Sequence, residues 1–259
     1  MLHKKCFVLD LDGTVYLGDI PIQGTIDFIL RHQSTIDFYY LSNNTSKAPA
    51  TYVNKLSSMG IPVSLDQFLS PVTPLVAHLR ANHIQTVYPV GNKDFVACLR
   101  EAMPELVILE EASEEMADAV VLAYDTELNY TKLSRSALLL QHPEVAFLAT
   151  HPDLVCPSPK GPLPDVGSFM ALYETATGRR PQHIFGKPDP AVLGPLLSRY
   201  AREDMVMVGD RLSTDKKLAE NAGIDFILVL SGEATRSDLA GLERQPTLVL
   251  DHLGQLETA

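Results

Sequence analysis

The stretch CFVLDLDGTVYLG, residues 6–18, constrains the fold more than any other part of the chain. Its first four residues form an unbroken apolar run, which is typical of a strand buried on both faces in a parallel sheet. The run then meets Asp10 and Asp12 and breaks at Gly13. Because side chains alternate along a strand, we expect both acids on one face and Leu11 on the other. Two adjacent carboxylates at a buried strand end are costly without a positive partner, so this end predicts a divalent-cation site, with a plain Asp-Gly turn as the alternative.

Strand and helix patterns alternate after this stretch and predict a parallel sheet with crossover helices. Asp189, followed by Pro190, is expected to cap a helix. The ends of the chain are alike, and together they predict one α/β core. Its expected strands and helices cover residues 26–31, 36–41, 49–59, 183–186, 205–210, 213–222 and 224–230.

The middle of the chain has its own strands and helices and then a proline-rich loop at 151–166, which is unsuited to a helix or a central strand. We therefore expect a Rossmann-like α/β core formed by residues 1–80 and 183–259, with a smaller α/β domain inserted at 81–182. The expected elements of the insertion are residues 86–90, 92–103, 106–110, 118–124, 132–141 and 145–150.

Composition limits the partners and the compartment. With 46% hydrophobic residues among 259, the chain can bury a full core. It carries 21 Lys and Arg against 32 Asp and Glu, a net charge of −11, which argues against nucleic acid as a partner but permits a small phosphorylated ligand. We expect Cys6, Cys98 and Cys156 to be packing residues, as in a reducing cytosol. No export signal or membrane span is expected, so the prediction is a cytoplasmic protein.

Polar residues follow four of the predicted core strands, and the carboxyl ends of parallel strands meet at one edge of a sheet. Oxygen ligands without His or Cys favour Mg²⁺ over Zn²⁺. A serine and the backbone N–H groups after it suit a phosphate, and a lysine would add positive charge. The residues at this edge are Asp10, Asp12, Ser42, Asn43, Asn44, Lys187, Asp210 and Asp215.

The chain resembles the haloacid dehalogenase-like (HAD) hydrolase superfamily in all four of its motifs, in order. The stretch AENAGIDFILVLSGEAT is also similar to the NagD-type subfamily, which includes 4-nitrophenylphosphatases and nucleotidases. The insertion is similar in position to the type-two cap of that subfamily, a domain that contributes to substrate choice. The four motifs are DLDGT at 10–14, Ser42, Lys187 in GKPDP, and GDRLSTD at 209–215.

The resemblance implies a Mg²⁺-dependent phosphatase that hydrolyses small organic phosphomonoesters, such as nucleotide, sugar or aryl phosphates. Asp10 would attack phosphorus and become an aspartyl-phosphate, and Asp12 would serve as general acid and then general base. The metal would be held by the carboxylates of Asp10 and Asp210 and by the backbone carbonyl of Asp12. The supporting residues would be Asp215 for the metal's waters or for Lys187, and Ser42, Asn43 and Lys187 for the phosphoryl group, with Asn44 beside them.

The expected cap loop contains Thr150-His151-Pro152-Asp153, where the subfamily usually has Thr-Asn-x-Asp. Asp153 is the candidate contact to the leaving group, and His151 replaces the usual Asn. Asp165 precedes a helix and is either its cap or a second specificity residue. Two other functions stay open: a phosphomutase with the same nucleophile, and a non-catalytic protein that binds a phosphate ligand. A homodimer is implied by the resemblance alone.

Overall fold

The computed structural model describes residues 1–158 and 160–257, which form two compact units. Unit 1 contains Met1–Ser42, Pro49–Leu69 and the described residues from Lys187 onward. Unit 2 contains Asn43–Ala48 and Ser70–Gly186. Each unit has its own parallel sheet and its own apolar core, so the predicted α/β fold class is confirmed.

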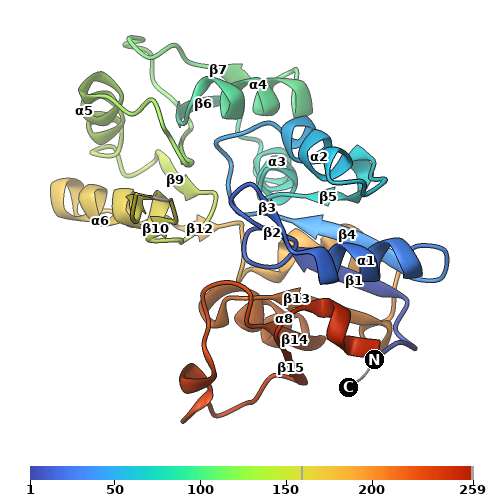
Figure 1. Ribbon diagram of the computed structural model, residues 1–259. Coiled ribbons are helices and arrows are strands. Elements are labelled where there is room, and N and C mark those ends of the chain that lie inside the picture. The colour runs from blue at the N-terminus through green and yellow to red at the C-terminus, as the bar shows by residue number, and fades with distance from the viewer. Residues whose placement is uncertain (159, 258–259) are drawn as a thin grey trace. The chain divides into compact units, whose positions relative to one another are not determined.

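The sheet of unit 1 joins strands from both ends of the chain, with β1 between β4 and β13 (Figure 1). All of its pairings are parallel, in the order β15-β14-β13-β1-β4-β5. The chain builds outward from β1 on one side and then from β13 on the other, so the strand order reverses between these two strands. The bounds are β1 Cys6–Asp10, β4 Asp37–Leu41, β5 Phe68–Leu69, β13 Met205–Gly209, β14 Asp225–Val229 and β15 Leu248–Leu250.

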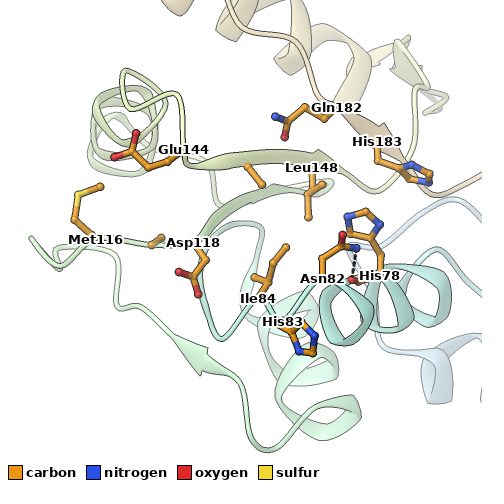
Figure 2. A pocket seen from close by; sticks show the side chains of 12 residues that line it. His78, Asn82, His83, Ile84, Met116, Asp118, Glu144, Leu148, Gln182 and His183 are labelled. Atoms are coloured by element: carbon orange, nitrogen blue, oxygen red, sulfur yellow. Dashed lines mark hydrogen bonds between the residues drawn. The ribbon is translucent and has the colours of Figure 1, made fainter.

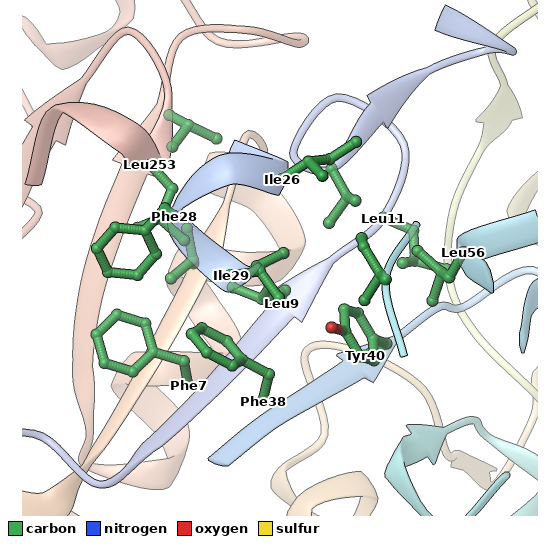
Figure 3. Packing of buried hydrophobic residues seen from close by; sticks show 14 of the residues in the cluster. Phe7, Leu9, Leu11, Ile26, Phe28, Ile29, Phe38, Tyr40, Leu56 and Leu253 are labelled. Atoms are coloured by element: carbon green, nitrogen blue, oxygen red, sulfur yellow. The ribbon is translucent and has the colours of Figure 1, made fainter. Parts of the chain in front are cut away.

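Alternation along β1 divides the core of unit 1 into two layers. Phe7 and Leu9 face a cluster that includes Phe28 of α1 and Phe38 of β4 (Figure 3), whereas Val8 faces a second cluster with α7 and α8. The Phe7 ring lies 5.7 Å from Phe38 and 6.0 Å from Phe28, between ring centroids. Burying each such ring contributes about 1.5–3 kcal/mol. The helices of unit 1 are α1 Gln23–His32, α2 Pro49–Ser58, α7 Gly194–Leu197 and α8 Lys217–Ala222.

Short elements complete unit 1. Asp189 caps a 3₁₀ turn, η2, by accepting from the Ala191 N–H at 2.9 Å, so the predicted cap is confirmed. The helix predicted at 213–222 begins as a π-helical turn, η4, before α8. The remaining bounds are β2 Tyr16–Leu17, β3 Ile20–Pro21, η1 Leu65–Gln67, η2 Pro190–Leu193, η3 Arg202–Asp204, η4 Leu212–Lys216, η5 Arg236–Leu239 and η6 Leu253–Glu257.

The sheet of unit 2 is also parallel, in the order β12-β9-β8-β6-β7. From β6 the chain goes to β7 on one side and then to β8 on the other, so this strand order reverses between β6 and β8. The strands are β6 Thr86–Val90, β7 Val107–Ile108, β8 Ala119–Leu122, β9 Ala146–Ala149 and β12 His183–Ile184, beside the hairpin β10 Val155–Cys156 and β11 Leu163–Pro164. The helices are α3 Val72–Ala81, α4 Lys93–Ala102, α5 Tyr130–Leu139 and α6 Val166–Thr177.

The two units divide the chain differently from the predicted domains at three places. Residues 183–186, predicted as a strand of the core, lie in unit 2, where β12 pairs with β9. Helix α3, which falls mostly within the predicted core range 1–80, belongs to unit 2 because Leu75 and Leu79 pack with Val87 and Leu99. The short segment 43–48 also belongs to unit 2. Where the functional boundary of the inserted domain lies stays a prediction.

A cavity of about 690 Å³ opens at the amino edge of the unit 2 sheet (Figure 2). Its wall includes the stacked rings of His78 and His183, whose centroids are 5.3 Å apart. The carboxylate of Asp118 at this edge accepts hydrogen bonds from the backbone N–H groups of Gln85 and Thr86. Ligands of open parallel sheets bind at the opposite, carboxyl edge.

Across the part of the chain that is described, every helix is too short or too polar to cross a bilayer. The three cysteines are free thiols, and Cys6 is fully buried, as expected of a packing residue.

Candidate active site

Asp10 ends β1 at the point where the unit 1 sheet reverses its strand order. Its side chain is buried and forms an ion pair with the Nζ of Lys187. Lys187 is the first residue of unit 1 after the chain returns from unit 2. Burial raises the pKa of Asp10 to about 6, while the charge of Lys187 acts in the opposite direction. The carboxylate is therefore held here against the cost of burial chiefly by the ammonium group of Lys187, with a smaller contribution from the charge of Arg211.

Asp210 follows β13, the neighbour of β1, and its carboxylate is surrounded by backbone. A Cβ on Gly232 or Gly13 would lie 2.0 or 2.4 Å from Asp210 Oδ2, so only glycine fits at either position. The Glu233 N–H donates to Oδ2 at 2.7 Å, but Oδ1 is buried without a hydrogen-bond partner among the described residues. Burial, followed by the charges of Asp10 and Asp215, raises the pKa of Asp210 to about 8.

Asp215 lies in the π-helical turn after β13 and connects the lysine to the backbone. Its Oδ1 accepts from Lys187 Nζ at 2.6 Å, and its Oδ2 accepts from the Arg211 N–H at 3.0 Å. A Cβ on Gly209 would lie 2.2 Å from Oδ2, so the strand end must be glycine. Burial opposes the charge of Lys187, but Asp10 and Asp215 outweigh it and raise its pKa.

These residues fit a hard divalent cation. One oxygen from each of Asp10, Asp210 and Asp215 lies within 4.8 Å of the others, and all three side chains are buried. The nearby ammonium of Lys187 neutralises only part of their charge. A buried carboxylate oxygen without a donor normally costs stability, and an oxygen-only donor set is what Mg²⁺ or Ca²⁺ prefers. Asp210 Oδ1 is therefore the atom whose environment most needs a cation.

Asp12 differs from the other acids because it is exposed. It lies beyond the end of β1, where Gly13 adopts a φ of +93° and turns the chain. Its Oδ1 accepts a long hydrogen bond, 3.4 Å, from the Gly18 N–H. The expected alternation holds, since Leu11 packs into the apolar cluster with Phe7 and Leu9. An exposed carboxylate can exchange protons with solvent, as a general acid and base must.

The predicted phosphate-binding residues 42–44 lie where the chain passes from unit 1 to unit 2. Ser42 follows β4, is buried, and donates its N–H to the Leu69 carbonyl at 3.3 Å. Asn43 is also buried and directs its amide to Asp153, at 3.3 and 3.4 Å from the two carboxylate oxygens. The Asn44 oxygen accepts from the N–H and hydroxyl of Ser46, so its side chain stabilises the turn.

The loop after β9 contains a second group of ionisable side chains, with very different bonding. His151 is fully buried, with Nδ1 2.9 Å from the Thr150 hydroxyl and Nε2 3.0 Å from Asp165 Oδ1. Asp165 also caps α6, at 2.7 Å from the Val166 N–H. Both side chains are thus bonded to each other inside unit 2, and Asp153 is the less buried acid of the loop.

Two features of the unit 1 site involve residues to which the sequence analysis gave no role of their own. Gly232 and Glu233, after β14, enclose the carboxylate of Asp210. The hydroxyls of Thr14 and Thr214 are buried there without a hydrogen-bond partner in the described chain. The Ser-Gly-Glu sequence after an apolar strand was the available signal for the first feature. The two threonines lie in the first and fourth motifs, but nothing in those motifs indicates that their hydroxyls are buried.

Comparison with protein-family models gives two matches. Residues 7–103 match a model described as haloacid dehalogenase-like hydrolase, and residues 184–256 match a second HAD-hydrolase-like model. An acid sugar phosphatase from Staphylococcus haemolyticus is 33% identical over 258 residues, which covers 95% of this chain and 93% of the relative.

Solved structures give the same picture. The 4-nitrophenylphosphatase from Thermotoga maritima superimposes with a TM-score of 0.91 and 37% identity, covering 100% of this chain and 98% of that one. The glycerol phosphate phosphatase from Mycobacterium tuberculosis, in complex with calcium, has a TM-score of 0.84 and 28% identity, with coverage of 95% and 72%. NagD from E. coli, at 23% identity and a TM-score of 0.86, covers 99% of both chains and supports the fold.

Proposed function

Because this chain belongs to the haloacid dehalogenase-like hydrolase family and is a phosphatase, we propose that it hydrolyses small organic phosphomonoesters through an aspartyl-phosphate on Asp10, with Mg²⁺ as cofactor. One observation carries the proposal. Three buried carboxylates, Asp10, Asp210 and Asp215, lie together at the point where the strand order of unit 1 reverses, and Lys187 pairs with Asp10 and Asp215. Nucleophile, cation ligands and a positive group are together there, in the crevice where open α/β sheets bind ligands.

Asp10 and Asp12 divide the chemistry because their environments differ. A carboxylate oxygen of Asp10 attacks phosphorus while the bond to the leaving oxygen breaks, and Asp12 gives that oxygen a proton. Asp12 then takes a proton from the water that attacks the aspartyl-phosphate, which releases inorganic phosphate and restores Asp10. The burial of Asp10 protects the nucleophile, and the exposure of Asp12 leaves its carboxylate open to the leaving oxygen and then to the attacking water.

The cation would be held by the carboxylates of Asp10 and Asp210 and by the backbone carbonyl of Asp12, with Asp215 supporting it. When bound, Mg²⁺ supplies stabilisation for the negative charge that develops on the phosphoryl oxygens. General acid catalysis contributes only about 10²–10⁴-fold, whereas enzymes accelerate phosphate-monoester hydrolysis by up to ~10²¹-fold, or roughly 29 kcal/mol at 1.36 per decade. Asp12 therefore needs both the nucleophile and the electrostatic groups.

Ser42, Asn43 and Lys187 would bind the phosphoryl group. Lys187 is fixed by two ion pairs, one to Asp10 and one to Asp215, so its position needs little reorganisation when the substrate arrives. Asp153 is the candidate contact for the leaving group, and we propose unit 2 as the substrate-selecting cap. The names of the relatives, acid sugar phosphatase and glycerol phosphate phosphatase, support sugar and polyol phosphates as the first substrates to test, ahead of nucleotide and aryl phosphates.

The test is phosphate release from a panel of sugar, polyol, nucleotide and aryl phosphates, assayed with Mg²⁺ and with EDTA. We expect metal-dependent release with a maximum on one chemical class. Isomerised sugar phosphate without free phosphate would replace the proposal by a phosphomutase. If no product forms but inorganic phosphate raises the melting temperature, a binding protein is the better description.

A further inference from the structure

Segment 43–48, which directly follows Ser42, is bonded to the point where the unit 2 sheet reverses its strand order. In an open parallel sheet this crevice, at the carboxyl ends of β6 and β8, is the usual place for a ligand. Here the loops after both strands bond to the protein's own chain instead. Asn43, Thr45 and Ser46 are all buried.

Asn92, directly after β6, provides the first attachment. Its Nδ2 donates to the Ser46 carbonyl at 2.7 Å and to the Thr126 hydroxyl at 3.2 Å. Its Oδ1 accepts from the Phe95 N–H at 3.1 Å and so caps α4. The buried side-chain amide of Asn92 therefore caps α4 through its oxygen and binds segment 43–48 through its nitrogen.

The loops after β8 and β9 provide two more attachments. The Tyr124 N–H, after β8, donates to the Thr45 hydroxyl at 3.1 Å. Asp153, after β9, accepts from the amide of Asn43. Residues 43, 45 and 46 are thus each fixed to a different strand end of unit 2, which leaves segment 43–48 little freedom to shift.

The chain passes between the two units a second time at Gly186 and Lys187, and this second crossing is fixed beside the first one at Ser42 and Asn43. A Cβ on Gly186 would lie 2.5 Å from Asn43 Oδ1 and 2.7 Å from the Thr150 carbonyl, so Gly186 packs directly against the first crossing. The next residue is Lys187. Both crossings therefore continue into residues of the phosphate site, Ser42 on one side and Lys187 on the other.

We propose that Asn92 and Thr45 are positioning residues for phosphate binding, and that they act by fixing the backbone that follows Ser42. The inference rests on the proposed function, because it takes Ser42 and Asn43 as phosphate ligands. Displacing a binding group by about 1 Å can cost on the order of 100-fold in rate. Because the phosphoryl group is held in the ground state as well as in the transition state, loss of an attachment should appear in KM and in inhibition by inorganic phosphate, more than in kcat.

Asn129 offers a matched control, since it caps α5 as Asn92 caps α4. Its Oδ1 accepts from the Lys132 N–H at 3.0 Å, but its amide donates to the exposed Glu111 at 2.8 Å and not to segment 43–48. Serine is a good N-cap, so Asn92→Ser and Asn129→Ser keep both caps and remove only the amide donors. Asn92→Ser should have the lower melting temperature, because it leaves the buried Ser46 carbonyl without its donor, so the two variants are compared by the Ki of the folded protein.

We expect Asn92→Ser to raise KM for 4-nitrophenyl phosphate and Ki for inorganic phosphate by about 10-fold, within the range expected for a displaced binding group, while Asn129→Ser matches the wild type. Thr45→Val should act like Asn92→Ser, and Thr45→Ser, which keeps the hydroxyl, should restore wild-type values. The inference is wrong if Asn92→Ser and Asn129→Ser have the same Ki. It is also wrong if Thr45→Val lowers the melting temperature without changing Ki. A wild-type protein that releases no phosphate from any substrate would instead overturn the proposed function itself.

Discussion

The two parallel sheets reverse their strand order in the same way, between β1 and β13 in unit 1 and between β6 and β8 in unit 2. At the first reversal the carboxylates of Asp10 and Asp210 lie close together, and Asp210 Oδ1 has no partner among the described residues. At the second, Asp125 pairs with Lys132 at 2.8 Å, and Asn92 binds the protein's own chain. One place in the fold holds an unsatisfied site and the other a satisfied one.

The difference lies in whether buried charge is matched by a partner within the chain. The Asp125 carboxylate is fully buried, yet it accepts from the ammonium of Lys132 and from the Glu127 N–H, both at 2.8 Å. Asp210 is as deeply buried, but the nearby ammonium of Lys187 pairs with Asp10 and Asp215. An unsatisfied buried group costs about 1–3 kcal/mol, so the unit 1 crevice gives up stability for a binding site, and the unit 2 crevice does not.

The largest effect is expected from Asp10→Asn, which removes the nucleophile. Turnover of 4-nitrophenyl phosphate should fall by roughly 10⁴-fold or more, as when other covalent nucleophiles are deleted. The fold should persist, because Lys187 keeps its ion pair with Asp215 and an amide replaces a carboxylate that burial already disfavours. Activity near the wild-type value, with unchanged protein concentration, would remove Asp10 as the nucleophile.

Asp125→Asn at the other reversal should do the opposite, lowering stability rather than chemistry. It leaves Lys132 buried with only carbonyl oxygens nearby, and breaking a buried pair typically costs about 3–5 kcal/mol. Urea denaturation measures the loss, and kcat of the folded protein should change little. Glu105→Gln is the control, because its pair with Arg80 is exposed and contributes at most about 1 kcal/mol. If both variants lose the same stability, the unit 2 pair is not the matched charge that the geometry indicates.

Asp210→Asn should separate cation binding from folding. In the wild type, Mg²⁺ should raise the melting temperature above its value in EDTA, because a ligand that binds the native state stabilises it. The variant should lose this shift and about 100-fold or more of its activity, while its melting temperature in EDTA is unchanged or higher. The control is Asp153→Asn, which changes an acid of unit 2 that accepts from the Asn43 amide, and it should keep the Mg²⁺-induced rise in melting temperature. A full Mg²⁺ shift in Asp210→Asn would place the cation elsewhere.

The smallest effect is expected from Asp153→Ala. As a leaving-group contact, Asp153 should influence which phosphomonoester is preferred, so its removal should change the ranking of substrates by a few-fold to about 10-fold. Activity on 4-nitrophenyl phosphate should change less. Asp153 also accepts from Asn43, and an equal loss on every substrate would show that this attachment is its main role.

Membership of the HAD family was predicted from four short motifs. The similarity to NagD-type phosphatases was predicted from the stretch AENAGIDFILVLSGEAT and from the position of the insertion, and the comparisons confirm both. The motifs were readable because each follows an apolar strand. Three of them follow strands of the unit 1 sheet. Lys187 instead follows β12 of the unit 2 sheet, so only packing decided that it lies beside Asp10. Strand β6 was predicted at its observed bounds, 86–90, because its sequence is also apolar. No helix was predicted at 72–81, and the predicted boundary left residues 72–80 with the core, whereas α3 packs against Val87 and Leu99 of unit 2.

The sequence by itself determined the fold class, the family and the acids at the carboxyl ends of β1 and β13 of the first sheet. Those features depend on local patterns, such as apolar runs, glycines and acids at strand ends. Only the tertiary structure decided which buried charges have a partner of opposite charge. Lys187 pairs with Asp10, 177 residues away in the sequence, and with Asp215, 28 residues away. The tertiary structure alone also decided that segment 43–48 bonds to the loops of unit 2, because Asn92 and Asn129 are the same residue type at the same helix position and differ only in what lies within reach of their amides.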